Sequence, residues 1–82
     1  MTAAEILKEV NRIFIDQLEN ENIVLNRASI ADDIEEWDSL THIQLIVAIE
    51  KHFKTRFTSA EIQNFKNVGE MCDALEKKIL LK

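Results

Sequence analysis

The stretch Glu36-Trp37-Asp38-Ser39-Leu40 lies where a polar segment meets the most apolar helical pattern of the chain. Asp38 is predicted to be the N-cap of that helix, because its carboxylate can accept hydrogen bonds from the first backbone N–H groups, which otherwise lack partners. Ser39 then falls in the first turn, at the positive end of the helix dipole, where a phosphate is favoured. The local residues leave two interpretations open: both residues only cap a helix, or Ser39 carries a phosphodiester.

The helix predicted from Ser39 to about Lys54 is apolar around most of its circumference. At about 100° per residue, the apolar side chains fall on two sides, one with Leu40, Ile43, Ile46 and Val47 and the other with Leu45, Ile49 and Phe53. A narrow strip is expected to face solvent, and it consists of Thr41, Gln44, Ala48 and Lys51. Because such a helix must be covered by other elements on most sides, we predict that it is the central helix of the fold.

Three further helices are predicted where a capping residue precedes apolar positions at helical spacing. They cover about residues 3–18, 59–65 and 68–80, after the capping residues Thr2, Thr58 and Asn67. The predicted core consists of Ile6, Val10, Phe14, Ile43, Ile46, Ile49, Phe53, Ile62, Leu75 and Ile79. The fold class is therefore all-α, a four-helix bundle with three long helices, one short helix and a long first loop.

The long first loop covers about residues 19–38 and carries no sustained apolar period. Ile30, Ile34 and Trp37 are expected to pin it to the core, and residues 23–25 to form a short segment against the core. Trp37, the only tryptophan, has two interpretations: packing at the junction of loop and helix, or contact with a partner protein.

Composition restricts the class of protein. A chain of 82 residues suffices for one small domain, predicted over residues 1–82, and 46% hydrophobic residues with no Pro and one Gly suit helices. The net charge of −5 argues against nucleic acid as a partner and favours basic proteins. No apolar run reaches the length of a membrane span, so no membrane insertion is expected, and the single cysteine, Cys72, fits a reducing cytoplasm.

With Asp38-Ser39-Leu40 opening the apolar helix of a short acidic chain, the order of elements resembles the acyl carrier protein family over nearly the whole length. The resemblance implies that Ser39 is esterified by 4′-phosphopantetheine, whose thiol holds acyl groups as thioesters, and that the chain has no catalytic activity of its own. It also implies that Asp38 and Leu40 complete the motif read by a phosphopantetheinyl transferase.

The same resemblance implies a docking surface on the second helix, formed here by Leu40, Thr41, Gln44, Val47 and Glu50, with Lys51 beside them. The implied partners are the phosphopantetheinyl transferase and the enzymes that load, transfer or condense acyl groups, with the carrier acting as a monomer. Family members with a fatty-acid role usually carry acids where this chain has Thr41 and Gln44, and the usual Gly shortly before Asp-Ser-Leu is absent. These departures favour a dedicated carrier for polyketide-like, peptide-like or surface-polymer synthesis over bulk fatty-acid synthesis.

Two alternatives remain beside this interpretation. In the first, Ser39 is a hydrolase nucleophile, which requires a base, an oxyanion hole and a cleft. The chain has Trp37 where such enzymes have Gly, and its two histidines, His42 and His52, lie on the same predicted helix as Ser39 without an evident orienting acid. His42, one turn from Ser39, is either a boundary residue or a contact to a phosphate. The second alternative is an unmodified helical adaptor that only binds other proteins.

Overall fold

The structure is a computed structural model that describes residues 2–80, so residues 1, 81 and 82 of the predicted domain lie outside the described part. Its helices are α1 (Ala3–Leu18), α2 (Ser39–Phe53), α3 (Ser59–Asn64) and α4 (Val68–Leu80), and a 3₁₀ turn, η1 (Ala31–Asp33), lies in the loop after α1. The stretch 2–80 contains no strand, and none of its helices is long and apolar enough to cross a membrane. The predicted all-α fold with three long helices and one short helix is confirmed.

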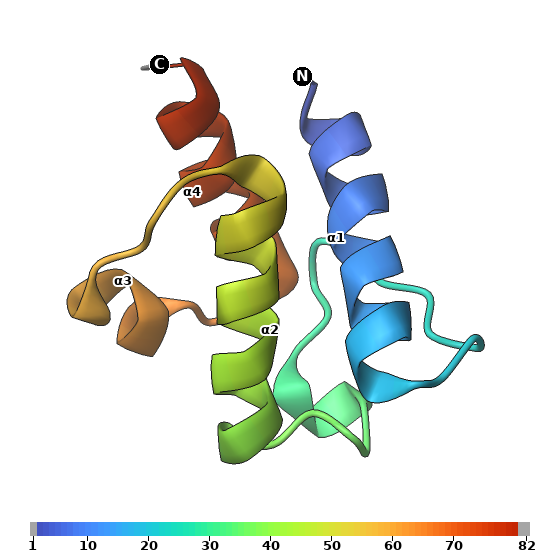
Figure 1. The fold of residues 1–82 in the computed structure, drawn as a ribbon. Coiled ribbons are helices and arrows are strands. Elements are labelled where there is room, and N and C mark those ends of the chain that lie inside the picture. The colour runs from blue at the N-terminus through green and yellow to red at the C-terminus, as the bar shows by residue number, and fades with distance from the viewer. Residues whose placement is uncertain (1, 81–82) are drawn as a thin grey trace.

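The three long helices pack side by side, and α3 stands apart on one side of α2 (Figure 1). α2 runs antiparallel to α1, and α1 contacts both α2 and α4. The start of α2 therefore lies near the end of α1, whereas the start of α1 and the end of α4 lie at the opposite end of the bundle (Figure 1). The first loop and η1 pass around the end at which α2 begins.

The predicted caps start the helices as expected. The side-chain oxygens of Thr2 and Thr58 accept from backbone N–H groups three residues later, at 3.2 and 3.1 Å, and the N-cap N–H of each returns a bond to a glutamate. Asn67 accepts from the N–H of Glu70 at 2.9 Å. These bonds satisfy N–H groups that have no partner inside the helix.

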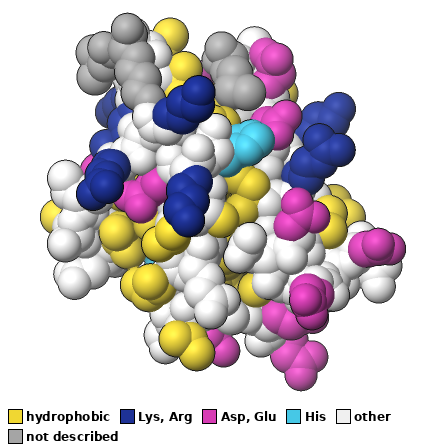
Figure 2. Space-filling model, in the orientation of Figure 1, with side chains coloured by type: hydrophobic (Ala, Val, Ile, Leu, Met, Phe, Trp, Pro, Cys, Tyr) yellow, Lys and Arg dark blue, Asp and Glu magenta, His cyan; other side chains and the backbone are white. Residues whose placement is uncertain are grey.

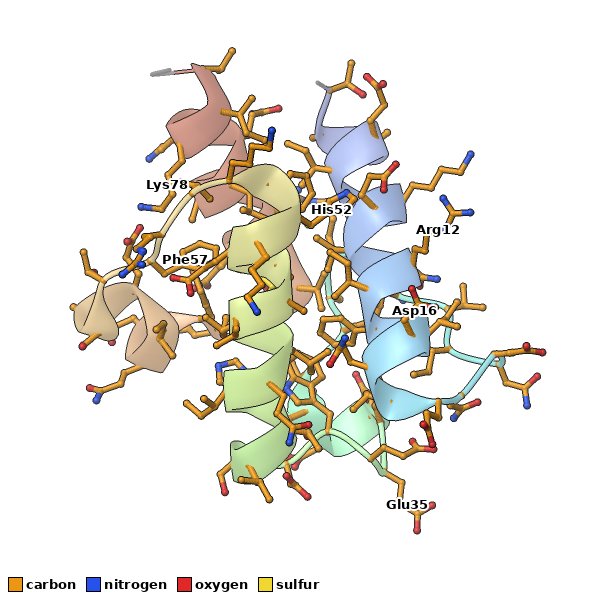
Figure 3. All side chains as sticks on the ribbon, viewed as in Figure 1. Arg12, Asp16, Glu35, His52, Phe57 and Lys78 are labelled. Atoms are coloured by element: carbon orange, nitrogen blue, oxygen red, sulfur yellow. The ribbon has the colours of Figure 1, made fainter. Side chains whose placement is uncertain are left out.

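α3 is tied to α4 by the side chain of Lys78 (Figure 3). Its ammonium group donates to Glu61 at 2.9 Å and lies 5.5 Å from the ring centroid of Phe57. Phe57 is buried and packs edge-to-face against Phe65, with 5.2 Å between the ring centroids. A helix of six residues is thus held by side chains at both of its ends.

Most of the predicted core is confirmed. The buried members of the predicted set are Ile6, Val10, Phe14, Ile46, Ile49, Phe53 and Leu75. Ile62 and Ile79 are half-buried and pack against this core. Ile43 was predicted to be buried, and that prediction is wrong, because 54% of its surface is exposed.

The exposure of Ile43 follows from the position of α2 in the bundle. The covered side of α2 carries Leu45, Ile46, Ile49 and Phe53. At about 100° per residue, Ile43 points away from Ile49, and so do Leu40 and Val47. The prediction that other elements surround α2 is therefore wrong, because α3 is too short to cover this side. In the predicted solvent strip, Gln44 and Lys51 are exposed, but Thr41 and Ala48 are half-buried.

The first loop is held by fewer isoleucines than predicted and by a side chain of α1. Trp37 is buried and Ile34 is half-buried, but Ile30 is 38% exposed. Asn11 of α1 fixes the segment of residues 23–25, because it accepts from the N–H of Leu25 at 2.6 Å and donates to the carbonyl of residue 23 at 3.3 Å. These bonds satisfy backbone groups that have no helix or sheet partner.

Gly69, the only glycine, lets the first loop approach the start of α4. Its N–H donates to the Arg27 carbonyl at 2.9 Å, and the N–H of Val68 donates to the Ser29 carbonyl at 2.9 Å. A Cβ at Gly69 would lie 2.8 Å from the carbonyl oxygen of Arg27 and 3.1 Å from its Cβ. Since a carbonyl of the backbone cannot turn away without losing these bonds, a side chain at this position would push the loop off α4.

We therefore expect Gly69→Ala to lower the free energy of unfolding by about 1–3 kcal/mol, the usual effect of overpacking a tight contact. Replacing an ordinary helical Gly by Ala has the opposite sign and stabilises by about 0.5–1 kcal/mol. Urea unfolding followed by circular dichroism distinguishes the two results. A raised midpoint would show that the loop does not approach α4 this closely.

Candidate functional site

Ser39 is the first residue of α2, and its side chain is exposed. Asp38 precedes it in an extended conformation, and one carboxylate oxygen accepts from the N–H groups of Leu40 at 3.0 Å and Thr41 at 2.9 Å. The hydrogen bond from the N–H of Thr41 contributes most to lowering the pKa of Asp38, and the bond from Leu40 adds to it. The carboxylate of Asp38 therefore stays ionised at neutral pH. The predicted cap is present, and it leaves the hydroxyl of Ser39 facing solvent.

Thr41 joins the end of the first loop to α2. Its hydroxyl accepts from the N–H of Asp38 at 2.8 Å and donates to the carbonyl of Glu36 at 2.8 Å. Thr41 therefore takes the place of the glutamate that usually completes a capping box. It is half-buried, and its hydroxyl is used inside the chain rather than offered to a partner.

Trp37 packs at the junction of loop and helix, as the first of its two interpretations predicted. It is 7% exposed, and its ring meets that of Phe14 edge-to-face at 4.8 Å between centroids. The indole N–H donates to Nδ1 of His42 at 3.0 Å, and the two rings are stacked at 5.9 Å. This pair was not among the sequence predictions, although a Trp five residues before a His across an N-cap is a signal that could have indicated it.

A row of exposed apolar side chains begins beside Ser39. Leu40 is 70% exposed, Ile43 54% and Val47 42%, and we refer to these three residues as the apolar strip. Figure 2 shows hydrophobic side chains at the surface over the N-terminal half of α2. An exposed group of apolar side chains on a small domain commonly marks a contact surface for another protein.

The predicted docking residues fall into two groups. Leu40, Gln44 and Val47 are exposed on one side of α2. Thr41 is bound to the first loop, and Glu50 is half-buried, with its carboxylate accepting from the N–H of Phe57 at 2.8 Å. The side chains of Thr41 and Glu50 are therefore bonded within the chain, whereas those of Leu40, Gln44 and Val47 face solvent.

Charge is unevenly distributed over the surface around α2. Lys51, Lys54 and Arg56 line a shallow groove beside Val47 at the C-terminal end of α2. Figure 2 shows Lys and Arg side chains gathered over this end of α2 and the chain that follows it, whereas Asp and Glu side chains predominate over the end of α1 and the loop after it. The apolar strip therefore runs from Ser39 towards a groove that is lined by these three cations and by Glu50.

A pocket of about 310 Å³ lies on the other side of the junction. Trp37 and His42 form one wall, and Phe65 and Met71 form another. Asp32 of η1 and Lys66, which precedes α4, also line it. Ser39 does not line this pocket, but an exposed serine at a helix N-terminus fits a covalently attached phosphate.

Comparison with known proteins agrees with this geometry. A family model described as the phosphopantetheine attachment site matches residues 3–75. An acyl carrier protein of Thermosynechococcus vestitus is 34% identical over 80 residues, which are 96% of this chain and 98% of that protein. An acyl carrier protein of Porphyromonas gingivalis is 31% identical over 93% of this chain and 97% of its own length. The solution structure of holo acyl carrier protein from Geobacter metallireducens matches with a TM-score of 0.87 and 41% identity, over 93% of this chain and 87% of that chain.

A small helical bundle with an exposed serine at the start of its second helix has the architecture of a carrier domain. The chain belongs to the acyl carrier protein family, whose members carry a phosphopantetheine attachment site. Proteins of this family are carriers without catalytic activity, their covalent group is 4′-phosphopantetheine, and they act with a phosphopantetheinyl transferase and biosynthetic enzymes.

In a carrier of this kind, the thiol of the attached arm should be the reactive one. Cys72 is fully buried in α4, and burial raises the pKa of its thiol to about 11. We expect dithiobis(nitrobenzoate) at pH 8 to find no reactive thiol in the native unmodified protein, because a buried neutral thiol is a poor nucleophile.

Denaturation with guanidinium chloride should expose Cys72 and release one equivalent of thionitrobenzoate. The Cys72→Ala variant serves as the control and should release none in either state. Rapid labelling of Cys72 in the native protein would contradict its burial in α4.

Proposed function

We propose that Ser39 is the attachment site of 4′-phosphopantetheine and that residues 1–82 form a single acyl carrier domain. The observation that carries the proposal is the exposed hydroxyl of Ser39 at the first position of α2, directly after the capping Asp38. The match of the family model to residues 3–75 supports both the site and the extent of the domain.

The residues around Ser39 suit this chemistry. When attached, 4′-phosphopantetheine supplies a thiol at the end of a flexible arm, and acyl groups are held on it as thioesters. In the transfer from coenzyme A, Ser39 Oγ would form a bond to the phosphorus that carries the pantetheine arm and give up its proton to a base of the transferase. The bond from that phosphorus to the bridging pyrophosphate oxygen would break, and adenosine 3′,5′-bisphosphate would leave. The N–H groups at the start of α2 favour a negative charge there, and Asp38 directs its carboxylate onto two of them instead of towards the hydroxyl.

We further propose that the carrier serves a specialised pathway in the cytoplasm rather than bulk fatty-acid synthesis. Its exposed face of α2 carries Gln44 and the apolar strip near Ser39, and Lys51 further along. Fatty-acid carriers of the family usually place acids on this face, where basic partner surfaces bind them. The neutral and basic character of α2 supports a partner selected by apolar contact, such as an enzyme that loads a polyketide-like, peptide-like or surface-polymer precursor.

Docking is proposed to rest on Leu40, Gln44 and Val47. We propose an indirect role for Asp38, Thr41 and Glu50. Their polar groups are hydrogen-bonded to the backbone, and they hold α2 and the adjoining segments in place. Apolar contacts are not screened by salt, whereas exposed ion pairs are screened over about 8–10 Å at physiological ionic strength. The carrier is expected to present this surface as a monomer.

We expect Ser39→Ala to remain folded but to take up no phosphopantetheine. Asp38 still caps α2 in this variant, and loss of an exposed hydroxyl usually changes stability by less than about 0.5 kcal/mol. The unmodified protein is incubated with coenzyme A and a broad-specificity phosphopantetheinyl transferase, and its intact mass is measured. Ser29→Ala and Ser59→Ala serve as controls and should gain the mass of the arm. A wild type that gains no mass would instead support the unmodified adaptor, and modification of Ser39→Ala would move the site elsewhere.

The docking proposal predicts that Val47→Asp slows the transferase reaction strongly at limiting carrier concentration. A carboxylate forced against an apolar partner surface loses hydration, and we expect KM to rise about tenfold. Gln63→Asp adds the same charge on α3 and should leave KM nearly unchanged. Raising salt from low to physiological strength should have only a modest effect. The proposal would be contradicted if KM depended steeply on salt and Val47→Asp left it unchanged. Docking would then be assigned to the loop acids Asp32, Asp33, Glu35 and Glu36.

A further inference from the structure

The hydrogen bond between Trp37 and His42 specifies the protonation state of the histidine. An indole N–H can only donate, so Nδ1 of His42 must be the acceptor at 3.0 Å. The neutral imidazole then carries its proton on Nε2. An imidazolium has protons on both nitrogens, and it cannot accept this bond.

This bond belongs to a set that joins residues 36–38 to the first turn of α2. Thr41 binds the carbonyl of Glu36 and the N–H of Asp38, and His42 binds the side chain of Trp37. The hydroxyl of Thr41 has no basic nitrogen, whereas an imidazole can bind a second proton on Nδ1. Within this set, the Trp37 bond is therefore the one that protonation of a side chain would remove.

Loss of the bond has a local consequence because Trp37 is buried. A buried N–H without a partner is unfavourable, so the indole must shift or admit water. Trp37 lies two residues before Ser39, and its ring rests between Phe14 of α1 and His42 of α2. Movement of Trp37 thus disturbs the segment that precedes the serine.

Other charged groups lie close to the imidazole. Asp32 from η1 and Lys66 from the segment before α4 line the same pocket as His42. In the junction itself, Glu36 and Asp38 flank Trp37 in the chain. A pH titration of the wild type contains contributions from all of these groups, so the test needs a variant that keeps them and changes only His42.

We propose that His42 is a positioning residue for the reaction at Ser39: its neutral imidazole holds Trp37 and the chain before the serine, and protonation of His42 releases them. Transfer of phosphopantetheine to Ser39 is then slower when His42 is protonated than when it is neutral. The kinetic part of this inference rests on the proposed function of Ser39, whereas the structural part does not.

The first measurement follows the fluorescence of Trp37, the only tryptophan of the chain, between pH 8 and pH 5. In His42→Asn the amide oxygen takes approximately the place of Nδ1, so it accepts the bond but does not titrate. The wild-type emission should change over this range, and that of His42→Asn should stay nearly constant. His52→Asn is the matched control, because His52 lies on the same helix but faces α1 and pairs with Glu9 at 3.1 Å (Figure 3). Its emission should follow the wild type.

The second measurement compares rates of transfer to Ser39 at each pH, as the ratio of wild type to His42→Asn, so that the pH dependence of the transferase itself cancels. We expect this ratio to fall about tenfold from pH 8 to pH 5, the effect of one lost hydrogen bond. His42→Leu, which cannot accept, should be slow at every pH, and Asn at this position should restore the rate.

Equal pH dependence of emission in the wild type and His42→Asn would overturn the inference, and so would a constant ratio of rates. If His42→Asn does not fold, His42→Gln provides the same non-titrating acceptor. Failure of the proposed function looks different: no variant would be modified at any pH, while the emission of Trp37 would still report on His42.

Discussion

The hydrogen bonds between residues 36–38 and the first turn of α2 are the constraint on which the candidate site depends. The start of α2 lies at the end of the bundle around which the first loop and η1 pass, and nearby side chains satisfy its free N–H groups. The carboxylate of Asp38 and the hydroxyl of Thr41 do this, and they also hold the end of the first loop. As a result, the backbone of Ser39 is held in place while its side chain is exposed to solvent.

The exposed side of α2 follows from the size of the chain. α2 carries more apolar side chains than its covered side can bury, and α3 has only six residues. Leu40, Ile43 and Val47 are consequently left in solvent, at some cost in hydration free energy. We propose that this surplus supplies a contact surface for partner enzymes next to the serine, without any additional element.

The first loop is ordered by polar contacts in addition to its apolar anchors, since Ile23, Leu25 and Trp37 are buried in the core. Asn11 binds the backbone of the segment after α1, and Gly69 admits the carbonyl of Arg27 to the start of α4. Backbone groups in a loop of this length would otherwise depend on water. Trp37 closes the loop at its far end, packed on Phe14 and bonded to His42, so that α1, the loop and α2 meet beside Ser39.

The sequence by itself determined where the helices begin, because a capping residue acts on N–H groups only two or three positions away. The same local logic left Ser39 as a capping residue or an attachment site, and the family resemblance implied the attachment site. The bounds of α1 and the start of α2 agree with the sequence prediction. Only the tertiary structure decided which side of α2 is covered, since Ile43 and Ile46 differ in burial through the positions of neighbouring helices and not through their own chemistry. It also decided the hydrogen-bond partners of Asn11 and His42, because the fold brings these donors and acceptors within reach of one another.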